Sequence, residues 1–200
     1  MPLAANDDYE PYFDDRINAM SVYVLPGNHF VQARGDNAIC TLLGSCVAAC
    51  ISDKNSTIGG LNHFLLPDGG SAGDGNLERY GVHAMEVLIN GILRLGAEKQ
   101  SLEAKIFGGA RVIETSSSDS VGDRNARFVQ EYLQTENIPI VAKDLGSNHA
   151  RRVYFFPTTG RVSVLNASTT ESGSLQQRDA EFRARAQARA EKRSGGVELF

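Results

Sequence analysis

Residues 40–67 read CTLLGSCVAACISDKNSTIGGLNHFLLP and contain the longest uninterrupted apolar run of the chain, Cys46 to Ile51. Two apolar segments flank the polar stretch 53–56, whose residue types favour a turn. The pattern predicts a buried strand, a tight turn at Gly44-Ser45, a second buried strand and then a further strand over 58–66. Residues 38–51 are rich in small and β-branched apolar types, which indicates that the first two strands are buried.

The spacing between these segments predicts which side chains meet. If the strands pair as a hairpin with Lys54-Asn55 at the tip, Asp53 faces Ser56 and Cys46 lies directly opposite His63. Directly opposite residues have Cβ atoms about 4.5–5.5 Å apart, which allows a thiol–imidazole contact. The pairing is conditional, because a longer loop would shift the register.

A cysteine beside a histidine suggests acyl-transfer chemistry. A free thiol has a pKa of about 8.5 and is mostly protonated at neutral pH, but an adjacent imidazole can remove its proton and create a nucleophile. Gly44 and Ser45 leave the backbone unhindered, so amides there can face a developing oxyanion. Thr41 is a candidate for orienting the imidazole. Two alternatives are open: a thiol protease, and a Cys46 that is only a core residue.

Composition excludes several other classes. The chain has 200 residues, which is room for one ordinary domain or two very small ones. A formal net charge of −4 argues against a nucleic-acid binder that works by bulk positive charge. No apolar run approaches the roughly 20 residues that cross a bilayer, and we see no secretory signal. The odd number of cysteines fits a reducing compartment. We therefore expect a cytoplasmic protein.

The rest of the chain predicts a mixture of strands and helices. Apolar spacing and Gly96 indicate a helix over 82–93, and a second helix is expected over 124–136. Further strands are expected over 20–34 (up to a Pro26-Gly27 turn), 105–110, 138–144, 151–157 and 161–166, with loops over 67–76 and 115–123. Strict alternation of strand and helix is missing, so we predict an α+β fold.

Three regions follow from charge and periodicity. Residues 1–19 are acidic and are expected to form a flexible arm, residues 20–170 form the main domain, and residues 171–200 form a polar tail. The tail contains an arginine-rich helix over 175–193 with too few apolar residues to need burial. It is either a solvated tail or a segment that docks on an acidic partner.

Several motifs resemble the CheD family of chemoreceptor glutamine deamidases. The resemblance is strongest in TLLGSCVA (41–48) and IGGLNHFLLP (58–67). It continues, in the expected order, in residues 79–81, 104–110, 121–125, 144–146 and 151–153. Together these motifs span roughly residues 20–166.

The resemblance implies a fold and an activity. The fold would be a layered α/β/β one, a β-sandwich of mixed sheets flanked by helices and related to bacterial toxin deamidases. The activity would be hydrolysis of chosen glutamines of methyl-accepting chemotaxis receptors to glutamate and ammonia. Family members can also cleave glutamyl methyl esters. No cofactor, metal, nucleic acid or membrane insertion is implied.

The resemblance also implies roles for individual residues. Cys46 matches the family nucleophile and His63 the general acid/base. The family's third residue is a threonine six positions before the cysteine, where this chain has Cys40. Either Thr41 takes that role or a backbone group orients His63. Gly44 and Ser45 are candidate oxyanion contributors, and Asn62 is a candidate for holding substrate.

Other functions are also compatible with these residues. One is a non-catalytic docking module that binds chemoreceptors or a CheC-type phosphatase of the chemotaxis system. Another is a metal site built from Cys40, Cys46, Cys50 and His63, but the spacing does not match a Cys-x2-Cys pair. The glycine-rich loop 67–76 lacks a phosphate-binding pattern, so we expect it beside the site, where it adapts to a receptor helix.

Overall fold

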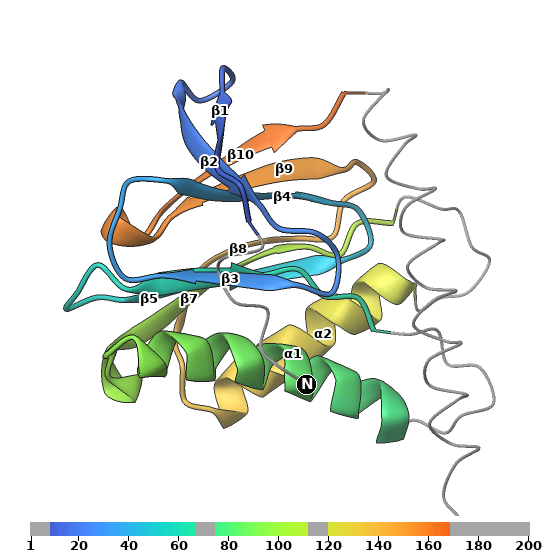
Figure 1. Ribbon diagram of the computed structural model, residues 1–200. Helices are drawn as coiled ribbons and strands as arrows, with labels where there is room; N and C mark the ends of the chain where they lie inside the picture. Colours follow the sequence, from blue (N-terminus) through green and yellow to red (C-terminus); the bar gives the residue numbers. More distant parts are fainter. Residues whose placement is uncertain (1–8, 67–74, 112–119, 169–200) are drawn as a thin grey trace, which may run out of the picture.

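The computed structural model describes residues 9–66, 75–111 and 120–168, which form three layers (Figure 1). Two α-helices lie beneath one sheet, and a second sheet lies on the other side of it. The elements are β1 (Tyr12–Asp14), β2 (Ala19–Tyr23), β3 (His29–Gln32), β4 (Ala38–Leu43), β5 (Val47–Asp53), β6 (Gly59–Asn62), α1 (Gly75–Arg94), β7 (Leu102–Gly108), α2 (Val121–Thr135), β8 (Ile140–Leu145), β9 (Arg151–Phe156) and β10 (Arg161–Asn166).

Both sheets are mixed and have five strands. The outer sheet has the order β1-β2-β4-β9-β10, and its β2–β4 pair is parallel. The middle sheet has the order β3-β6-β5-β7-β8, and its β7–β8 pair is parallel. The remaining pairs are antiparallel. The α+β prediction and the expected β-sandwich of mixed sheets are therefore confirmed.

Strand β5 explains the long apolar run, because it lies at the centre of the middle sheet. Val47, Ala49 and Ile51 face the helices, where they pack with Leu88 and other core residues. Ala48 and Cys50 alternate with them and face the outer sheet. A strand covered on both faces is apolar along most of its length, so Val47 to Ile51 form a continuous apolar run instead of an alternation.

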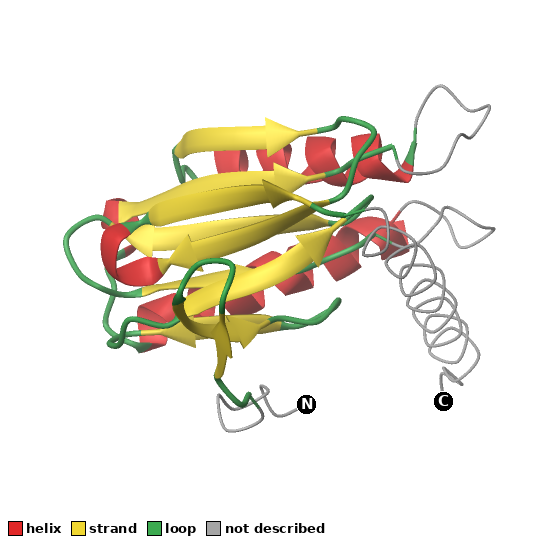
Figure 2. Ribbon diagram, turned by 90° about the horizontal axis from the view of Figure 1, so that it is seen from above, coloured by secondary structure: helices red, strands yellow, loops and turns green. Residues whose placement is uncertain are grey.

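The two helices cover the free face of the middle sheet (Figures 1 and 2). Helix α1 packs on β3 and β6, and α2 packs on β5, β7 and β8. The first turn of α2 approaches the turn after β7 so closely that a Cβ on Gly122 would lie 2.5 Å from the carbonyl oxygen of Gly109. This contact fixes the N-terminal end of α2 near the start of β5, where Val47 pairs with Gly108.

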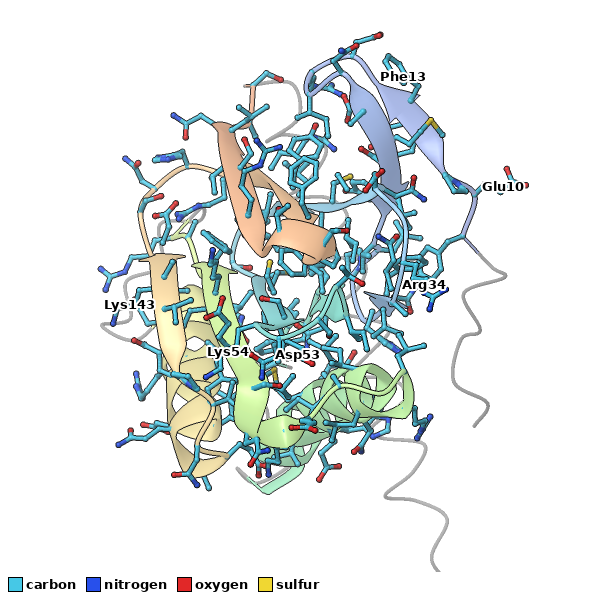
Figure 3. All side chains as sticks on the ribbon, turned by 90° about the vertical axis from the view of Figure 1, so that its left-hand side faces the viewer. Glu10, Phe13, Arg34, Asp53, Lys54 and Lys143 are labelled. Carbon is cyan, nitrogen blue, oxygen red and sulfur yellow. The ribbon has the colours of Figure 1, made fainter. Side chains whose placement is uncertain are left out.

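The hairpin between β5 and β6 differs from the predicted one. Cys50 pairs with Leu61, and the backbone N–H of Asp53 donates to the carbonyl of Ile58. The loop therefore has four residues, 54–57, in place of the expected two-residue tip. Asp53 accepts bonds from the backbone of Asn55 and the hydroxyl of Ser56, which stabilises the longer turn. Figure 3 shows Asp53 and Lys54 at this end of the molecule.

Part of the predicted flexible arm is ordered. Strand β1 lies within residues 1–19 and pairs with β2. Its Asp14 is only 2% exposed and accepts a hydrogen bond from the hydroxyl of Tyr154, 2.8 Å away on β9. Acidic composition suggested solvation, but a carboxylate with enough donors can be buried. Phe13 of this strand points away from the molecule (Figure 3).

Two element boundaries also differ from the predictions. Helix α2 begins at Val121, inside the expected loop 115–123, because Ser120 and Asp123 form a capping box. Helix α1 begins at Gly75, inside the expected loop 67–76. Residues 1–8, 67–74 and 115–119 of the predicted arm and loops, and the tail from residue 171 with its helix 175–193, lie outside the described residues.

The Gly122 contact predicts that alanine at this helical position destabilises the protein, which is the opposite of the usual effect. Replacing a helical glycine by alanine ordinarily stabilises a protein by roughly 0.5–1 kcal/mol. Gly122→Ala should instead lower the free energy of unfolding by about 1–3 kcal/mol, because the new methyl group overlaps the Gly109 carbonyl. Urea denaturation measures the change, with exposed Arg127→Ala on the same helix as the control. A neutral or stabilising Gly122→Ala would contradict this contact.

Candidate functional site

Thr41 and His63 are brought together by two strands from different sheets. On β4, Ile39 and Leu43 face the layer between the sheets. Thr41 lies two residues from each of them, so its side chain faces the same layer. On the middle sheet, Leu61 and Leu65 face the same layer, so His63 points into it as well. The Thr41 Oγ1 atom lies 2.7 Å from the His63 Nδ1 atom. This contact joins the two sheets through polar side chains in an otherwise apolar layer.

The hydrogen bonds of Thr41 define the tautomer of His63. The Thr41 hydroxyl donates to the carbonyl of Val24, with an O···O distance of 2.8 Å. A hydroxyl has one proton to donate, so its contact with the imidazole must be as an acceptor. The Nδ1 atom of a neutral His63 therefore carries the proton, and its Nε2 atom has the lone pair.

Cys46 shares the face of His63 but is not directly opposite it. The observed register places Val47 opposite Phe64 and therefore His63 opposite Ala48. The predicted register is wrong by two positions, because the loop is two residues longer. A shift of two keeps every side chain on its original face, whereas a shift of one would reverse it. Cys46 is thus a diagonal neighbour of His63, within the cluster that also contains Leu61 and Leu65.

All three side chains are buried. Cys46 and Thr41 are 0% exposed and His63 is 1% exposed. Burial lowers the pKa of His63 from its usual 6.5 to about 4, because the charged imidazolium loses its hydration. Its buried Nε2 atom has no hydrogen-bond partner among the described residues. The imidazole is therefore neutral at physiological pH, with a lone pair inside the layer that contains Cys46.

The backbone around Cys46 is held by the turn after β7 and by α2. The carbonyls of Gly44 and Ser45 accept hydrogen bonds from the Ala110 N–H and the Asn125 side-chain amide, each 2.8 Å long. The carbonyl of Cys46 accepts from the N–H of Gly109 at 2.7 Å. Gly44 and Ser45 thus form the turn that leads to Cys46, and their carbonyls point toward the segments that hold them.

Asn62 lies apart from these three side chains. Its Oδ1 atom accepts from the backbone N–H of Ala49, and its Nδ2 atom donates to the carbonyl of Ala84 and contacts the sulfur of Met85. Neighbouring residues of a strand point to opposite faces, so Asn62 faces α1 while His63 faces the outer sheet. The structure therefore ties Asn62 to the helix layer and does not bring it to Cys46.

The other two cysteines lie in different clusters. Cys40 faces the outside of the outer sheet, where its sulfur lies 3.2 Å from the Tyr12 hydroxyl. Cys50 is in the core between the sheets, where burial raises the pKa of its thiol. Cys40 therefore lies on the opposite face of its sheet from the layer that holds the other three residues considered for a metal site, and no group of three or more potential metal ligands occurs among the described residues.

Sequence reasoning did not assign a role to two contributors. The Val24 carbonyl accepts the Thr41 proton, but a backbone atom leaves no signal in residue type. Asn125 lies in the motif 121–125, yet nothing in that motif indicates a contact with Ser45, which is 80 residues away in sequence. Both contacts depend on how distant elements pack.

Comparison with known proteins identifies relatives over the whole chain. The profile of the family described as "CheD chemotactic sensory transduction" matches residues 65–166, about half of the chain. A protein of Xanthomonas campestris pv. campestris (strain B100) is 47% identical over 194 residues, covering 97% of this chain and 96% of its own. A protein of Janthinobacterium sp. (strain Marseille) is 44% identical over 192 residues, covering 94% and 93%. Both are named "Probable chemoreceptor glutamine deamidase CheD".

Two further findings complete the comparison. A crystal structure of a Neisseria meningitidis protein of the DUF152 family matches with a TM-score of 0.44 and 14% identity, covering 76% of each chain, which is too remote to bear on function. Within the described residues, no helix has the length and apolar character to span a membrane. The close, nearly full-length similarity to the Xanthomonas and Janthinobacterium proteins shows that this chain belongs to the CheD family.

Proposed function

We propose that this chain hydrolyses the side-chain amides of glutamines in chemoreceptors, with Cys46 as nucleophile and His63 as general base and acid. One observation carries the assignment of the residues: Thr41 holds His63 in the tautomer whose Nε2 lone pair lies in the same layer as Cys46. The names of the close relatives support the substrate class. The family resemblance supports the roles of the two residues.

In the first half of the reaction, His63 Nε2 takes the proton of the Cys46 thiol. The thiolate attacks Cδ of the glutamine and forms a tetrahedral intermediate whose oxygen carries the negative charge. The intermediate collapses, the C–N bond breaks, and the imidazolium gives its proton to the departing nitrogen. Ammonia leaves, and a thioester joins the glutamyl group to Cys46.

Hydrolysis of the thioester reverses these roles. His63 is neutral again and takes a proton from a water molecule, which attacks the thioester carbon. The C–S bond breaks, and the proton returns from His63 to the sulfur. The net change is glutamine plus water to glutamate plus ammonia. A glutamyl methyl ester presents the same acyl carbon with methanol as leaving group, so the same site serves both reactions.

Burial explains why a neutral histidine is suitable for this reaction. A base must be unprotonated to accept the thiol proton, and the low pKa of His63 keeps it so well below pH 7. The Thr41–Val24 arrangement orients the ring without introducing a second charge. Because the three side chains are buried, substrate entry requires movement of the residues that cover them.

The family resemblance extends the proposal to the cell. It supports a cytoplasmic location, where the signalling parts of chemoreceptors are accessible, and a CheC-type phosphatase as a second partner. New carboxylates on a receptor change its charge and therefore its packing and signalling. A docking module without catalysis is the competing function. Measuring both binding and glutamine conversion with a receptor fragment separates the two.

Cys46→Ala should abolish conversion of glutamine to glutamate in a chemoreceptor cytoplasmic fragment, because no other residue supplies the thioester. Peptide mass spectrometry of the fragment after incubation measures the conversion. Cys50→Ala is the matched control, since Cys50 is a buried cysteine of the same core cluster and should leave the conversion unchanged. A wild-type protein that binds the fragment but produces no conversion would favour the docking module.

Thr41→Val should lower kcat by up to about 100-fold, because valine has nearly the same shape but cannot fix the imidazole tautomer. Thr41→Ser keeps the hydroxyl and should recover most of the activity. Cys40→Ala tests position 40, where the family has its threonine. This variant should have no effect on kcat, since Cys40 faces away from His63. Steady-state deamidation kinetics measure all three variants. Equal activity of Thr41→Val and wild type would remove Thr41 from the site.

The lowered pKa of His63 predicts a pH-dependent stability. The pKa is about 4 in the folded protein and 6.5 for a histidine exposed to water, so the unfolded chain binds the proton first as the pH falls. This stabilisation is complete above pH 6.5 and is lost on descending to pH 4. Between pH 7 and 5 the free energy of unfolding should fall by about 2 kcal/mol on account of His63.

Urea denaturation of wild type and His63→Gln at both pH values isolates this contribution. Burial also lowers the pKa of His29, and this residue is common to both proteins. The wild type should lose more stability than the variant on going to pH 5. An identical loss in both proteins would mean that His63 is not buried in its neutral form.

A further inference from the structure

One short segment binds both partners of the Thr41–His63 contact. Residues 24–28, VLPGN, connect β2 of the outer sheet with β3 of the middle sheet (Figure 1). At the start of this segment, the carbonyl of Val24 accepts the Thr41 hydroxyl at 2.8 Å. The connection between the two sheets therefore begins at the atom that determines how Thr41 meets the imidazole.

The end of the same segment binds the backbone of His63. The N–H of His63 donates to the carbonyl of Asn28 at 2.9 Å, and the carbonyl of His63 accepts from the N–H of Gly27 at 2.7 Å. Two adjacent residues of the segment thus oppose one residue of the middle sheet, which is the arrangement of a β-bulge. The peptides on both sides of the His63 Cα atom, and with them the base of its side chain, are therefore held by Gly27 and Asn28.

Gly27 has the left-handed backbone conformation that its bond to His63 requires. Its φ is 82°, and the N–H of Asn28 donates to the carbonyl of Leu25 at 3.1 Å across the turn. Because Pro26 fixes its own φ near about −65°, a positive φ at the next residue makes this a type II turn. In the commoner type I turn the central peptide is rotated by roughly 150–170°. The N–H of Gly27 would then point away from the His63 carbonyl.

We propose that Gly27 is a positioning residue whose left-handed conformation keeps the His63 imidazole within hydrogen-bond distance of Thr41. The inference rests on the proposed function, in which His63 is the base, and it adds the element that aligns this base. Gly27 touches neither the imidazole nor the reacting sulfur. It acts through the carbonyl of His63.

Alignment matters because Thr41 selects the tautomer only while the hydrogen bond exists. The Thr41 Oγ1 atom lies 2.7 Å from His63 Nδ1, at the short end of the range of about 2.7–3.2 Å for such bonds. At a longer distance either ring nitrogen of a neutral imidazole can carry the proton. A ring with its proton on Nε2 has no lone pair there to accept the Cys46 proton.

The test varies position 27 in the full-length protein. Alanine disfavours positive φ, so Gly27→Ala shifts the turn toward type I. Gly27→Asn is the conservative variant, because asparagine tolerates the left-handed region. Gly96→Ala is the matched control. Gly96 follows α1 with a φ of 105°, and a Cβ there would lie 4.0 Å from Ile58, so the backbone strain is similar but the site is not involved.

Two measurements are compared on these proteins. Nitrogen-15 NMR of labelled protein near neutral pH shows which imidazole nitrogen of His63 carries the proton, and His63→Gln assigns the signals. Steady-state deamidation of a chemoreceptor cytoplasmic fragment gives kcat and KM. Both are made at a temperature at which circular dichroism shows every variant used to be folded.

We expect wild type, Gly27→Asn and Gly96→Ala to carry the His63 proton on Nδ1, and Gly27→Ala to show a mixture of tautomers. The kcat of Gly27→Ala should fall about tenfold, with KM within about twofold of wild type. Gly27→Asn should stay within about threefold of the wild-type kcat. Gly96→Ala should lower Tm as Gly27→Ala does, yet keep the wild-type kcat.

Hydrogen exchange of the wild-type protein provides a test that needs no variant to fold. The bond from Gly27 to His63 predicts that the Gly27 amide exchanges at least about tenfold more slowly than in an unstructured peptide. Exchange at the unprotected rate would overturn the inference even if Gly27→Ala does not fold.

Other results would also overturn the inference. One is a Gly27→Ala protein that matches Gly96→Ala in both tautomer and kcat. Another is a Gly27→Asn protein as impaired as Gly27→Ala, and a third is a wild type whose His63 proton lies on Nε2. A wild type with the expected tautomer but no deamidation would instead overturn the proposed function, so the two failures are distinguishable.

Discussion

Burial of β5 on both faces is the constraint on which the rest of the structure depends. Its residues alternate between the helix layer and the layer between the sheets, and each must be small or apolar to fit. A strand of this kind requires a covering layer on each face of its sheet. That requirement is met by the outer sheet on one face of β5 and by α1 and α2 on the other. It also explains why the residues of β5 belong to two separate cores.

The candidate site lies where this central strand begins. Cys46 precedes β5 and belongs to the core between the sheets, while Thr41 reaches the same layer from the outer sheet. A polar cluster in such a place must satisfy its own hydrogen bonds, because no solvent is available. Within the described residues, the series of hydrogen bonds from Val24 through Thr41 to His63 satisfies every group except His63 Nε2. The unsatisfied atom is the one that the proposed reaction uses.

The helix layer contributes geometry to the same site. Gly122 lets α2 approach the turn after β7, whose amides bond to the carbonyls of Gly44 and Cys46. Asn125 completes the support from one helical turn further on. The side chain of Cys46 belongs to the core between the sheets, and the backbone on either side of its Cα atom is held by α2 and by the turn after β7. Support from several elements favours rigid placement of the proposed nucleophile, because a closely packed interior resists displacement.

The sequence by itself determined the element types and the chemistry. The apolar run 46–51, the turn residues and the helical spacing over 82–93 predicted an α+β fold because these signals are local, whereas the layered arrangement was implied only by the family resemblance. The motifs shared with the CheD family are also local stretches of sequence, and they indicated Cys46 and His63 as site residues. Charge alone misjudged β1, because the burial of Asp14 depends on Tyr154, 140 residues away.

Tertiary structure decided the relations between distant residues. Loop length set the strand register, and only the even shift kept Cys46 on the face of His63. Strand alternation in β4 turned Thr41 inward and Cys40 outward, which spacing from Cys46 could not reveal. The tautomer of His63 depends on the Val24 carbonyl, and the Ser45 peptide on Asn125. These contacts join separate layers. They form only when the layers pack, so the residue types in the sequence do not reveal them.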